Sequence, residues 1–224
     1  MNISTLEFEI GEIVLLLGIA QCLYISVYIA FRMRYFRLEI LPLSYFIVLA
    51  AALSLDLAAR FIGSGFDWYP IAQWVVWYLL PPLSVLLIIQ VASITQPPKP
   101  RHFIVLCVIP AAFAVSWLIA GLDNECQHKM LTCRPLHDWL VVTGVIGGAL
   151  ALLEIWFSRD LLNNVRIQKN GKERFWLIIT LDVMAVSFLA LELFGLGEVL
   201  SERDAQIIRG IFGISLAYIA STVL

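Results

Sequence analysis

Residues 14–31 read VLLLGIAQCLYISVYIAF, and this stretch decides the fold class. A strand of a membrane barrel would alternate apolar and polar side chains over about ten residues, and this stretch does not alternate. A helix needs about 20 mostly apolar residues to cross a bilayer core of about 30 Å. The stretch therefore predicts a transmembrane α-helix.

The rest of the chain repeats this pattern. The predicted helices span residues 10–31, 40–62, 71–93, 103–120, 139–157, 175–196 and 207–224. Hydrophobic residues make up 61% of the chain and charged residues 14%, against about 45–50% and about 25% in soluble domains. We therefore expect one all-α domain over residues 1–224, a polytopic membrane protein with seven transmembrane helices. The net charge of −2 gives no reason to expect a nucleic-acid partner.

The charges of the loops predict the orientation. Lys and Arg accumulate in cytoplasmic loops. The first, third and fifth loops with their flanks hold Arg32, Arg34, Arg37, Lys99, Arg101, Arg159, Arg166, Lys169, Lys172 and Arg174, whereas the other loops hold Lys129, Arg134 and Arg203. The bias predicts that the N-terminus lies outside and the C-terminus in the cytoplasm.

Two of the four cysteines fall in the loop 121–138, which this orientation places outside. Disulfides persist in oxidising compartments, and a bond between Cys126 and Cys133 would stiffen the loop. The alternative is a metal site that includes His128 or His137, but four ligands at a typical zinc spacing are not evident. We predict the disulfide.

Small residues recur at every fourth position in several predicted helices, which lets helix backbones approach closely in lipid. One such seam holds Gly213, Ala217 and Ser221, and another holds Gly144 and Gly148. The seams are expected to pack within one bundle. A homodimer through one of them is the alternative.

Several kinds of chemistry find no support. A retinal Schiff base needs a Lys amine in the seventh helix, and residues 207–224 contain none. The three histidines are expected in loops, which argues against a haem held between two histidines inside the bundle. No phosphate-binding loop, nucleophile elbow or metalloprotease motif is present. We expect no cofactor and no catalytic activity in this chain.

Four ionisable residues are expected in one layer near the outer ends of three helices: Asp56, Arg60, Glu192 and Arg209. An isolated charge at the bilayer centre costs about 2.5–3.5 kcal/mol on insertion scales, so pairing is expected. Asp56 would pair with Arg60 one turn away, and Glu192 with Arg209. Whether the pairs only stabilise the bundle or also form a ligand site is left open.

Aromatic residues gather at the same level, in FDWYPIAQWVVWYLL at residues 66–80. Trp74, Trp77 and Tyr78 would lie deeper than an interfacial belt and wall a pocket that opens outward. The alternative is an aromatic helix that faces lipid.

Asp182 is expected about two turns into the sixth helix from its inner end. Tyr218 should reach a similar depth on the seventh helix, so a hydrogen bond between the two side chains is expected. The contact would serve either as a switch or proton-linked element or simply to hold the two helices together.

In helix number, outside N-terminus and short loops, the chain resembles the seven-helix sensor modules of bacterial transmembrane receptors of the histidine kinase or cyclase type. The resemblance implies a bacterial inner (plasma) membrane protein that binds a small amphipathic or apolar ligand in its outer half. The signal would pass to a cytoplasmic output domain, which we expect beyond Leu224. One alternative is a transporter or channel with a polar path from the outer charges to Asp182. Another is a non-catalytic membrane subunit or assembly factor that works through its small-residue seams.

Overall fold

The structure is a computed structural model. It describes residues 10–33, 40–62, 66–92, 98–123, 126, 130–157, 171–197, 199 and 202–223. A few side chains inside the described helices, among them those of Arg60, Ala217 and Ser221, are not described.

Every regular element in the described part of the chain is a helix. The elements are α1 (Ile10–Met33), α2 (Ile40–Ile62), α3 (Tyr69–Ala92), η3 (Pro100–Cys107), α4 (Val108–Ala120), η5 (Met130–Thr132), α5 (Arg134–Phe157), α7 (Gly171–Leu196) and α8 (Glu202–Val223). The predicted all-α fold is confirmed for these residues. Six of the helical segments, namely α1, α2, α3, η3 with α4, α5 and α7, are long and apolar enough to cross a membrane. In α8 the described apolar segment is shorter, Ile207–Leu216.

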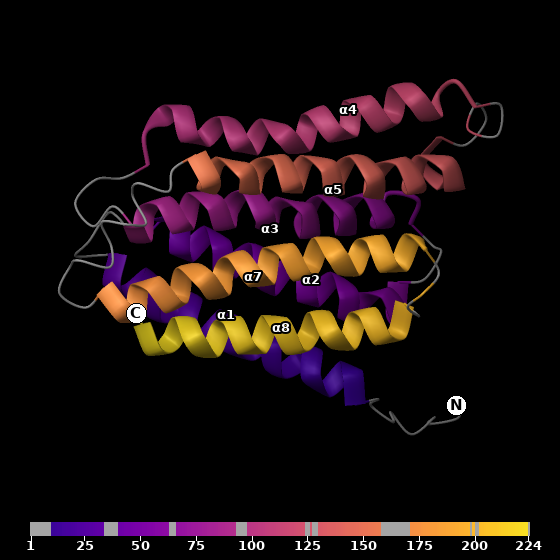
Figure 1. Ribbon diagram of the computed structural model, residues 1–224. Coiled ribbons are helices and arrows are strands. Elements are labelled where there is room, and N and C mark those ends of the chain that lie inside the picture. Colours follow the sequence, from indigo (N-terminus) through magenta and orange to yellow (C-terminus); the bar gives the residue numbers. More distant parts are fainter. Residues whose placement is uncertain are drawn as a thin grey trace, which may run out of the picture.

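The helices run alongside one another and form a bundle, with the start of α1 and the end of α8 at opposite ends (Figure 1). One end holds Ile10, Ile62, Tyr69, Ala120, Arg134, Leu196 and Glu202. It is called the disulfide end below, because the segment between α4 and α5 carries a disulfide. The first helix therefore starts at the end opposite the one at which the last helix finishes, as an odd number of passes requires.

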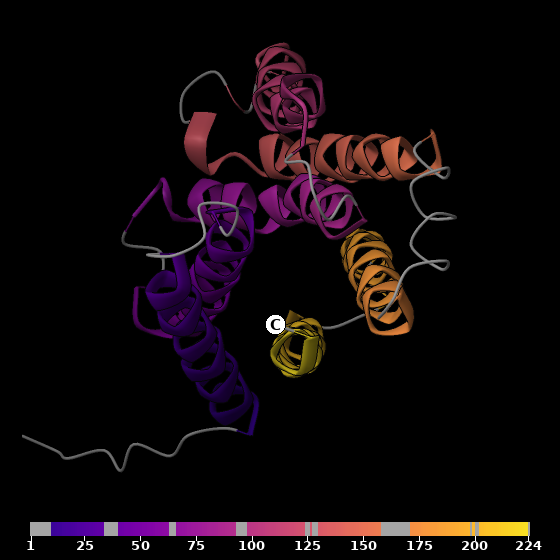
Figure 2. The ribbon, with the colours of Figure 1, turned by 90° about the vertical axis from the view of Figure 1, so that its left-hand side faces the viewer.

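Helix α3 is the centre of the bundle. It packs against α2, α5 and α7, whereas α4 lies on the outside against α5 and α1 packs against α2 and α8 (Figure 2). More than half of the residues of α3 are buried, in an almost continuous run from Tyr78 to Ile89. The aromatic residues of α3 therefore lie inside the protein.

Five helical segments begin earlier than the sequence indicated, among them α3 at Tyr69, α7 at Gly171 and α8 at Glu202. The segment predicted at 103–120 starts at Pro100 with a 3-10 helix, and the one predicted at 139–157 starts at Arg134. Proline is tolerated in the first turn, where its missing N–H has no intrahelical partner, so Pro100 and Pro135 fit these starts. The prediction that His102 and His137 lie in loops is therefore wrong for both residues.

The small-residue seams pack inside the chain. A Cβ atom added at three of their glycines would lie close to a side chain of another helix: Gly144 at 2.6 Å from the Tyr78 ring, Gly148 at 2.8 Å from Leu189, and Gly213 at 3.2 Å from Leu53. These glycines thus allow α5 and α8 to approach their neighbours in one copy. The homodimer through the same seams stays a prediction.

Candidate functional site

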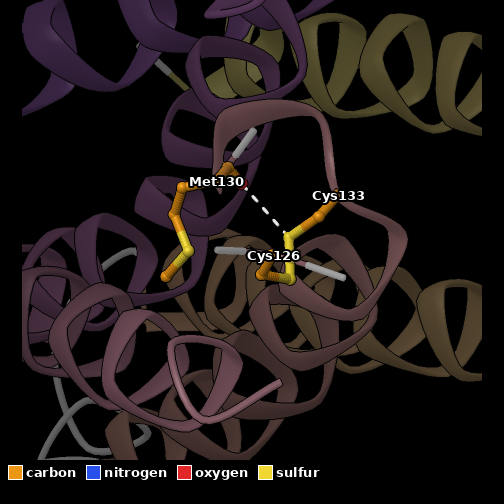
Figure 3. Close-up of a disulfide and its surroundings, with 3 residues drawn as sticks. All are labelled: Cys126, Met130 and Cys133. Atoms are coloured by element: carbon orange, nitrogen blue, oxygen red, sulfur yellow. Dashed lines mark hydrogen bonds between the residues drawn. A yellow bond between two sulfur atoms is a disulfide. The ribbon is translucent and has the colours of Figure 1, made fainter. Parts of the chain in front are cut away.

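The segment between α4 and α5 is closed by a disulfide between Cys126 and Cys133, with a Cα–Cα distance of 5.3 Å (Figure 3). Cys126 is fully buried, and the sulfur of Cys133 lies 3.2 Å from the carbonyl oxygen of Met130. The predicted bond is confirmed. No group of three or more His, Cys, Asp or Glu side chains with metal-site geometry occurs among the described residues, so the metal alternative gains no support.

Three charged side chains from three helices meet near the disulfide end and form what we call the charged cluster: Asp56 of α2, Glu192 of α7 and Arg209 of α8. Arg209 lies between the two carboxylates. Its Nε is 3.3 Å from Oδ2 of Asp56, and its Nη1 is 2.9 Å from Oε1 of Glu192. The side chain of Asp56 is 0% exposed, and those of Arg209 and Glu192 are 9% and 17% exposed.

Asp56 is also held by α3. Its Oδ1 accepts hydrogen bonds from Nε2 of Gln73 at 2.5 Å and from Nε1 of Trp77 at 3.0 Å. A buried carboxylate needs such donors, because it has lost its water. The cluster therefore ties α2, α3, α7 and α8 together.

An aromatic ring packs against the cation of this cluster. The guanidinium carbon of Arg209 lies 5.2 Å from the centre of the Trp77 ring, within the range of a cation–π contact. The Trp77 ring stacks on Phe188 at 5.4 Å, and the Tyr78 hydroxyl lies 3.4 Å from Oε2 of Glu192.

The pairing differs in part from the prediction. Glu192 and Arg209 form the predicted ion pair. Asp56, which was expected to pair with Arg60, contacts Arg209. The side chain of Arg60 lies outside the described residues, so a contact between Arg60 and Asp56 stays a prediction.

A cavity of about 200 Å³ lies against the charged cluster, and we call it the aromatic cavity. Its walls are Pro70, Gln73, Trp74, Trp77 and Tyr78 of α3, His137, Leu140 and Val141 of α5, Glu192 of α7 and Arg209 of α8. At roughly 30 Å³ per water, it has room for about six waters. Five of the seven predicted ligand-binding residues line it. Asp56 does not line it, but it contacts Trp77 and Arg209, which do.

The rings of the cavity are fixed in place. Trp74 donates from Nε1 to the carbonyl oxygen of Leu140 at 2.7 Å, and its ring centre lies 5.4 Å from that of Tyr78. Trp74, Trp77 and Tyr78 are 6%, 5% and 2% exposed. The alternative of an aromatic helix facing lipid is therefore wrong for these three side chains.

Five wall residues were not among the predicted ligand-binding residues, and two of them, His137 and Gln73, are polar. His137 was expected in a loop. It lies seven residues, or about two helical turns, before Gly144, and Gly144 faces the Tyr78 ring. Extending the seam of Gly144 toward the start of α5 would have placed His137 on the face that lines the cavity. Gln73 lies one residue before Trp74, and its bond to Asp56 could not be read from spacing.

A second, smaller cavity of about 40 Å³ lies deeper in the bundle, between α2, α3, α7 and α8. It has room for about one water, and the hydroxyls of Tyr45 and Ser84 are among its few polar groups. Trp77 and Arg209 line both cavities. These two side chains therefore separate the aromatic cavity from the deeper one.

Asp182 lies apart from both cavities, in a groove between α5 and α7. Tyr218 is on α8 and is 64% exposed. The expected hydrogen bond between Asp182 and Tyr218 is not among the contacts that the structure gives for Asp182, and it stays a prediction.

No protein-family model matches this chain, and no curated protein or solved structure was found to be similar to it. The class of protein that the structure supports is thus a helical bundle with six segments fit to cross a membrane. Inside the bundle, a carboxylate, a guanidinium, an imidazole and three aromatic rings border one cavity.

Proposed function

We propose that the chain is a membrane sensor module that binds a small amphipathic molecule in the aromatic cavity. The observation that carries the proposal is that Glu192 and Arg209 of the charged cluster line the same cavity as the rings of Trp74, Trp77 and Tyr78. Ligand sites typically combine apolar and aromatic walls with placed polar groups. This cavity has both, with Gln73, His137, Glu192 and Arg209 as its polar wall residues. In the proposed orientation, the disulfide end faces the outside of the cell.

The size and the walls of the cavity indicate the kind of ligand. About 200 Å³ is less than the roughly 300–1,000 Å³ of sites for drug-sized molecules, so the ligand is small. Its apolar part would lie against Trp74 and Tyr78. Its polar end would meet Glu192, which is more exposed than Arg209.

The charged cluster also offers a route for a signal. Arg209 belongs to α8, which continues to the opposite end over about 20 Å (14 residues to Val223 at 1.5 Å each). A ligand that competes for Glu192 changes the contact between α7 and α8, and it favours whichever arrangement of these helices binds it better. A cytoplasmic output domain attached after α8 would respond to that shift.

The test uses purified protein and named probes: indole, and straight-chain amines and carboxylates of four to eight carbons. We expect at least one probe to raise the thermal unfolding temperature, since a ligand at 100 times its Kd stabilises by about 2.7 kcal/mol. The effect should disappear in the triple variant Asp56→Asn, Glu192→Gln, Arg209→Met. It should persist in the control Arg134→Gln, Asp138→Asn, which removes an exposed ion pair at the same end of the bundle.

Two results would reject the proposal. One is that no probe stabilises the wild-type protein. The other is that a probe stabilises the triple variant as much as the wild type, which would place its site elsewhere.

A transporter or channel is the second candidate, and the deeper cavity beyond Trp77 and Arg209 is the observation in its favour. Under this hypothesis the two side chains would move aside for a solute. Efflux of the same probes from loaded vesicles, faster in Trp77→Ala than in the wild type, would support it. The polar path to Asp182 that this hypothesis predicted gains no support, because Asp182 lines neither cavity. The subunit or assembly-factor hypothesis named the small-residue seams as its working surface, and Gly144, Gly148 and Gly213 of these seams face neighbouring helices of the same chain.

A further inference from the structure

A groove of about 670 Å³ lies between α5 and α7, which pack side by side at one edge of the bundle (Figure 2). Its walls are Val, Leu, Ile and Ala side chains, and Asp182 is the one charged residue among them. Val186 and Leu193 of α7 and Leu153 of α5 line it and are at least half exposed. The groove is therefore an outward-facing surface, distinct from the aromatic cavity.

Asp182 stands well inside the candidate span Arg174–Leu196. It lies eight residues from Arg174 and fourteen from Leu196, or about 12 Å and about 21 Å along the helix. The residue is half-buried. Within the part of the chain that the structure describes, no hydrogen bond or ion pair reaches its carboxyl group.

This isolation is unusual for a helix in lipid. Ionisable residues inside membranes generally pair with another group, because an unpaired charge at the helix centre costs about 2.5–3.5 kcal/mol on insertion scales. Asp56 and Glu192 follow this rule, since each contacts Arg209. The isolation of Asp182 instead indicates that its partner belongs to another molecule.

A second copy of the chain does not supply that partner. Arg209 is buried inside the bundle. The other Lys and Arg residues of the described helices lie near helix ends: Arg32, Arg60, Arg101, Arg134, Lys172, Arg174 and Arg203. No cation on the described helices of a second copy would therefore stand at the depth of Asp182 on an outer face.

The shape of the groove fits a helix. Ala149 of α5 and Ala190 of α7 line it and are exposed or partly exposed, and small residues of this kind let a helix backbone approach closely in lipid. We propose that the groove receives a transmembrane helix of another protein, with a Lys or Arg of that helix paired to Asp182. The inference rests on the membrane placement proposed above, but not on a ligand in the aromatic cavity.

The experiment measures binding of a synthetic helix to the full chain in phosphatidylcholine vesicles, by energy transfer between fluorophores. The probe is a leucine-rich transmembrane peptide with one Lys about 12 Å from the end that lies beside Arg174. Companion peptides carry the Lys two turns away or lack it. We expect the matched probe to bind at least tenfold more tightly than either companion.

Variants of the chain locate the contact. Asp182→Leu should remove the tenfold preference, whereas Glu154→Gln, which neutralises another carboxylate of the bundle, should retain it. Ala149→Trp should block binding by filling the groove. Leu150→Trp is its control, because Leu150 is 58% exposed on the same helix and does not line the groove.

Equal binding of all three peptides, or unchanged binding by Asp182→Leu or by Ala149→Trp, would overturn the proposal. So would self-association of the chain that Asp182→Leu abolishes, because a second copy would then occupy the groove. Failure of the membrane placement is seen separately, as failure of the chain to float with the vesicles in a density gradient.

Discussion

Arg209→Met is expected to have one of the largest effects of any single substitution, because two carboxylates depend on this side chain. The substitution removes the cation that contacts Asp56 and Glu192 and keeps a side chain of similar length. Asp56 is 0% exposed and Glu192 17% exposed, so neither carboxylate regains much water. Breaking a buried ion pair from one side typically costs about 3–5 kcal/mol, and we expect a loss of this size.

The distances explain why the single substitution is costly while the intact cluster is close to neutral. With an effective dielectric constant of about 20, charges 3.3 Å and 2.9 Å apart attract by about 5 and about 6 kcal/mol. Removing each ion from water costs several kcal/mol, and three ions are involved. The attractions and these costs nearly cancel, whereas Arg209→Met keeps two of the costs and loses both attractions.

The same reasoning predicts that neutralising all three residues is mild. The triple variant Asp56→Asn, Glu192→Gln, Arg209→Met should lie within about 1 kcal/mol of the wild type, because replacing a complete buried ion pair is often neutral or stabilising. The amide oxygen introduced at residue 56 can still accept the hydrogen bonds of Gln73 and Trp77.

The assay is reversible unfolding in mixed micelles, by titration with a denaturing detergent and detection by far-ultraviolet circular dichroism. The control Arg134→Gln, Asp138→Asn removes an exposed pair and should change the free energy of unfolding by less than about 1 kcal/mol. The reasoning would be refuted if Arg209→Met cost less than about 1 kcal/mol, or if the triple variant were as unstable as the single one.

Three further predictions concern other parts of the molecule. The disulfide between Cys126 and Cys133 closes a short loop, so Cys126→Ala with Cys133→Ala should lower the free energy of unfolding by about 2–3 kcal/mol; unreduced peptide mapping that finds two free thiols would reject the bond. A cysteine introduced into the segment 158–170, between α5 and α7, should resist a membrane-impermeant reagent in intact cells, and ready labelling there would reverse the proposed orientation. Gly144→Ala should destabilise the bundle by about 1–3 kcal/mol in the same titration, because the added methyl overpacks against the Tyr78 ring. Its control is Gly195→Ala, which has no atom within 4 Å of the added methyl and should be neutral or stabilising.

The number and the approximate positions of the helices could be read from the sequence, because each apolar stretch has the length of a bilayer crossing. The errors lie at the starts of helices, among them η3, α5, α7 and α8. Residues 134–138 include Arg134, His137 and Asp138, and residues 100–102 include Pro100. Such segments do not look apolar, yet they continue the helix beyond its apolar part.

The depth of the site residues could also be read from the sequence, but not which face of each helix they occupy. Residue counting placed Asp56, Glu192 and Arg209 at one level, and the structure brings the three together. Both faces of these helices are apolar, so hydropathy does not reveal which face turns inward. For this reason the sequence indicated only Arg60, the basic residue nearest to Asp56 in the chain, and not the contact with Arg209.

Small residues indicate which face of a helix turns toward the bundle interior, which hydropathy does not reveal. In α5, residues 137, 140, 144 and 148 lie along one face; Gly144 and Gly148 touch α3 and α7, and His137 and Leu140 line the aromatic cavity. A glycine seam extended by one or two turns thus indicates which polar side chains point into the bundle.

The same rule accounts for the partner of Asp56. Gly213 of α8 packs against Leu53 of α2. One turn toward the disulfide end, α8 presents Arg209, four residues before Gly213, and α2 presents Asp56, three residues after Leu53. Residues three or four apart share a helix face, so the contact between Gly213 and Leu53 sets Arg209 opposite Asp56. The ion pair at 3.3 Å follows from the absence of a side chain at residue 213, which brings the two helices close enough for it to form.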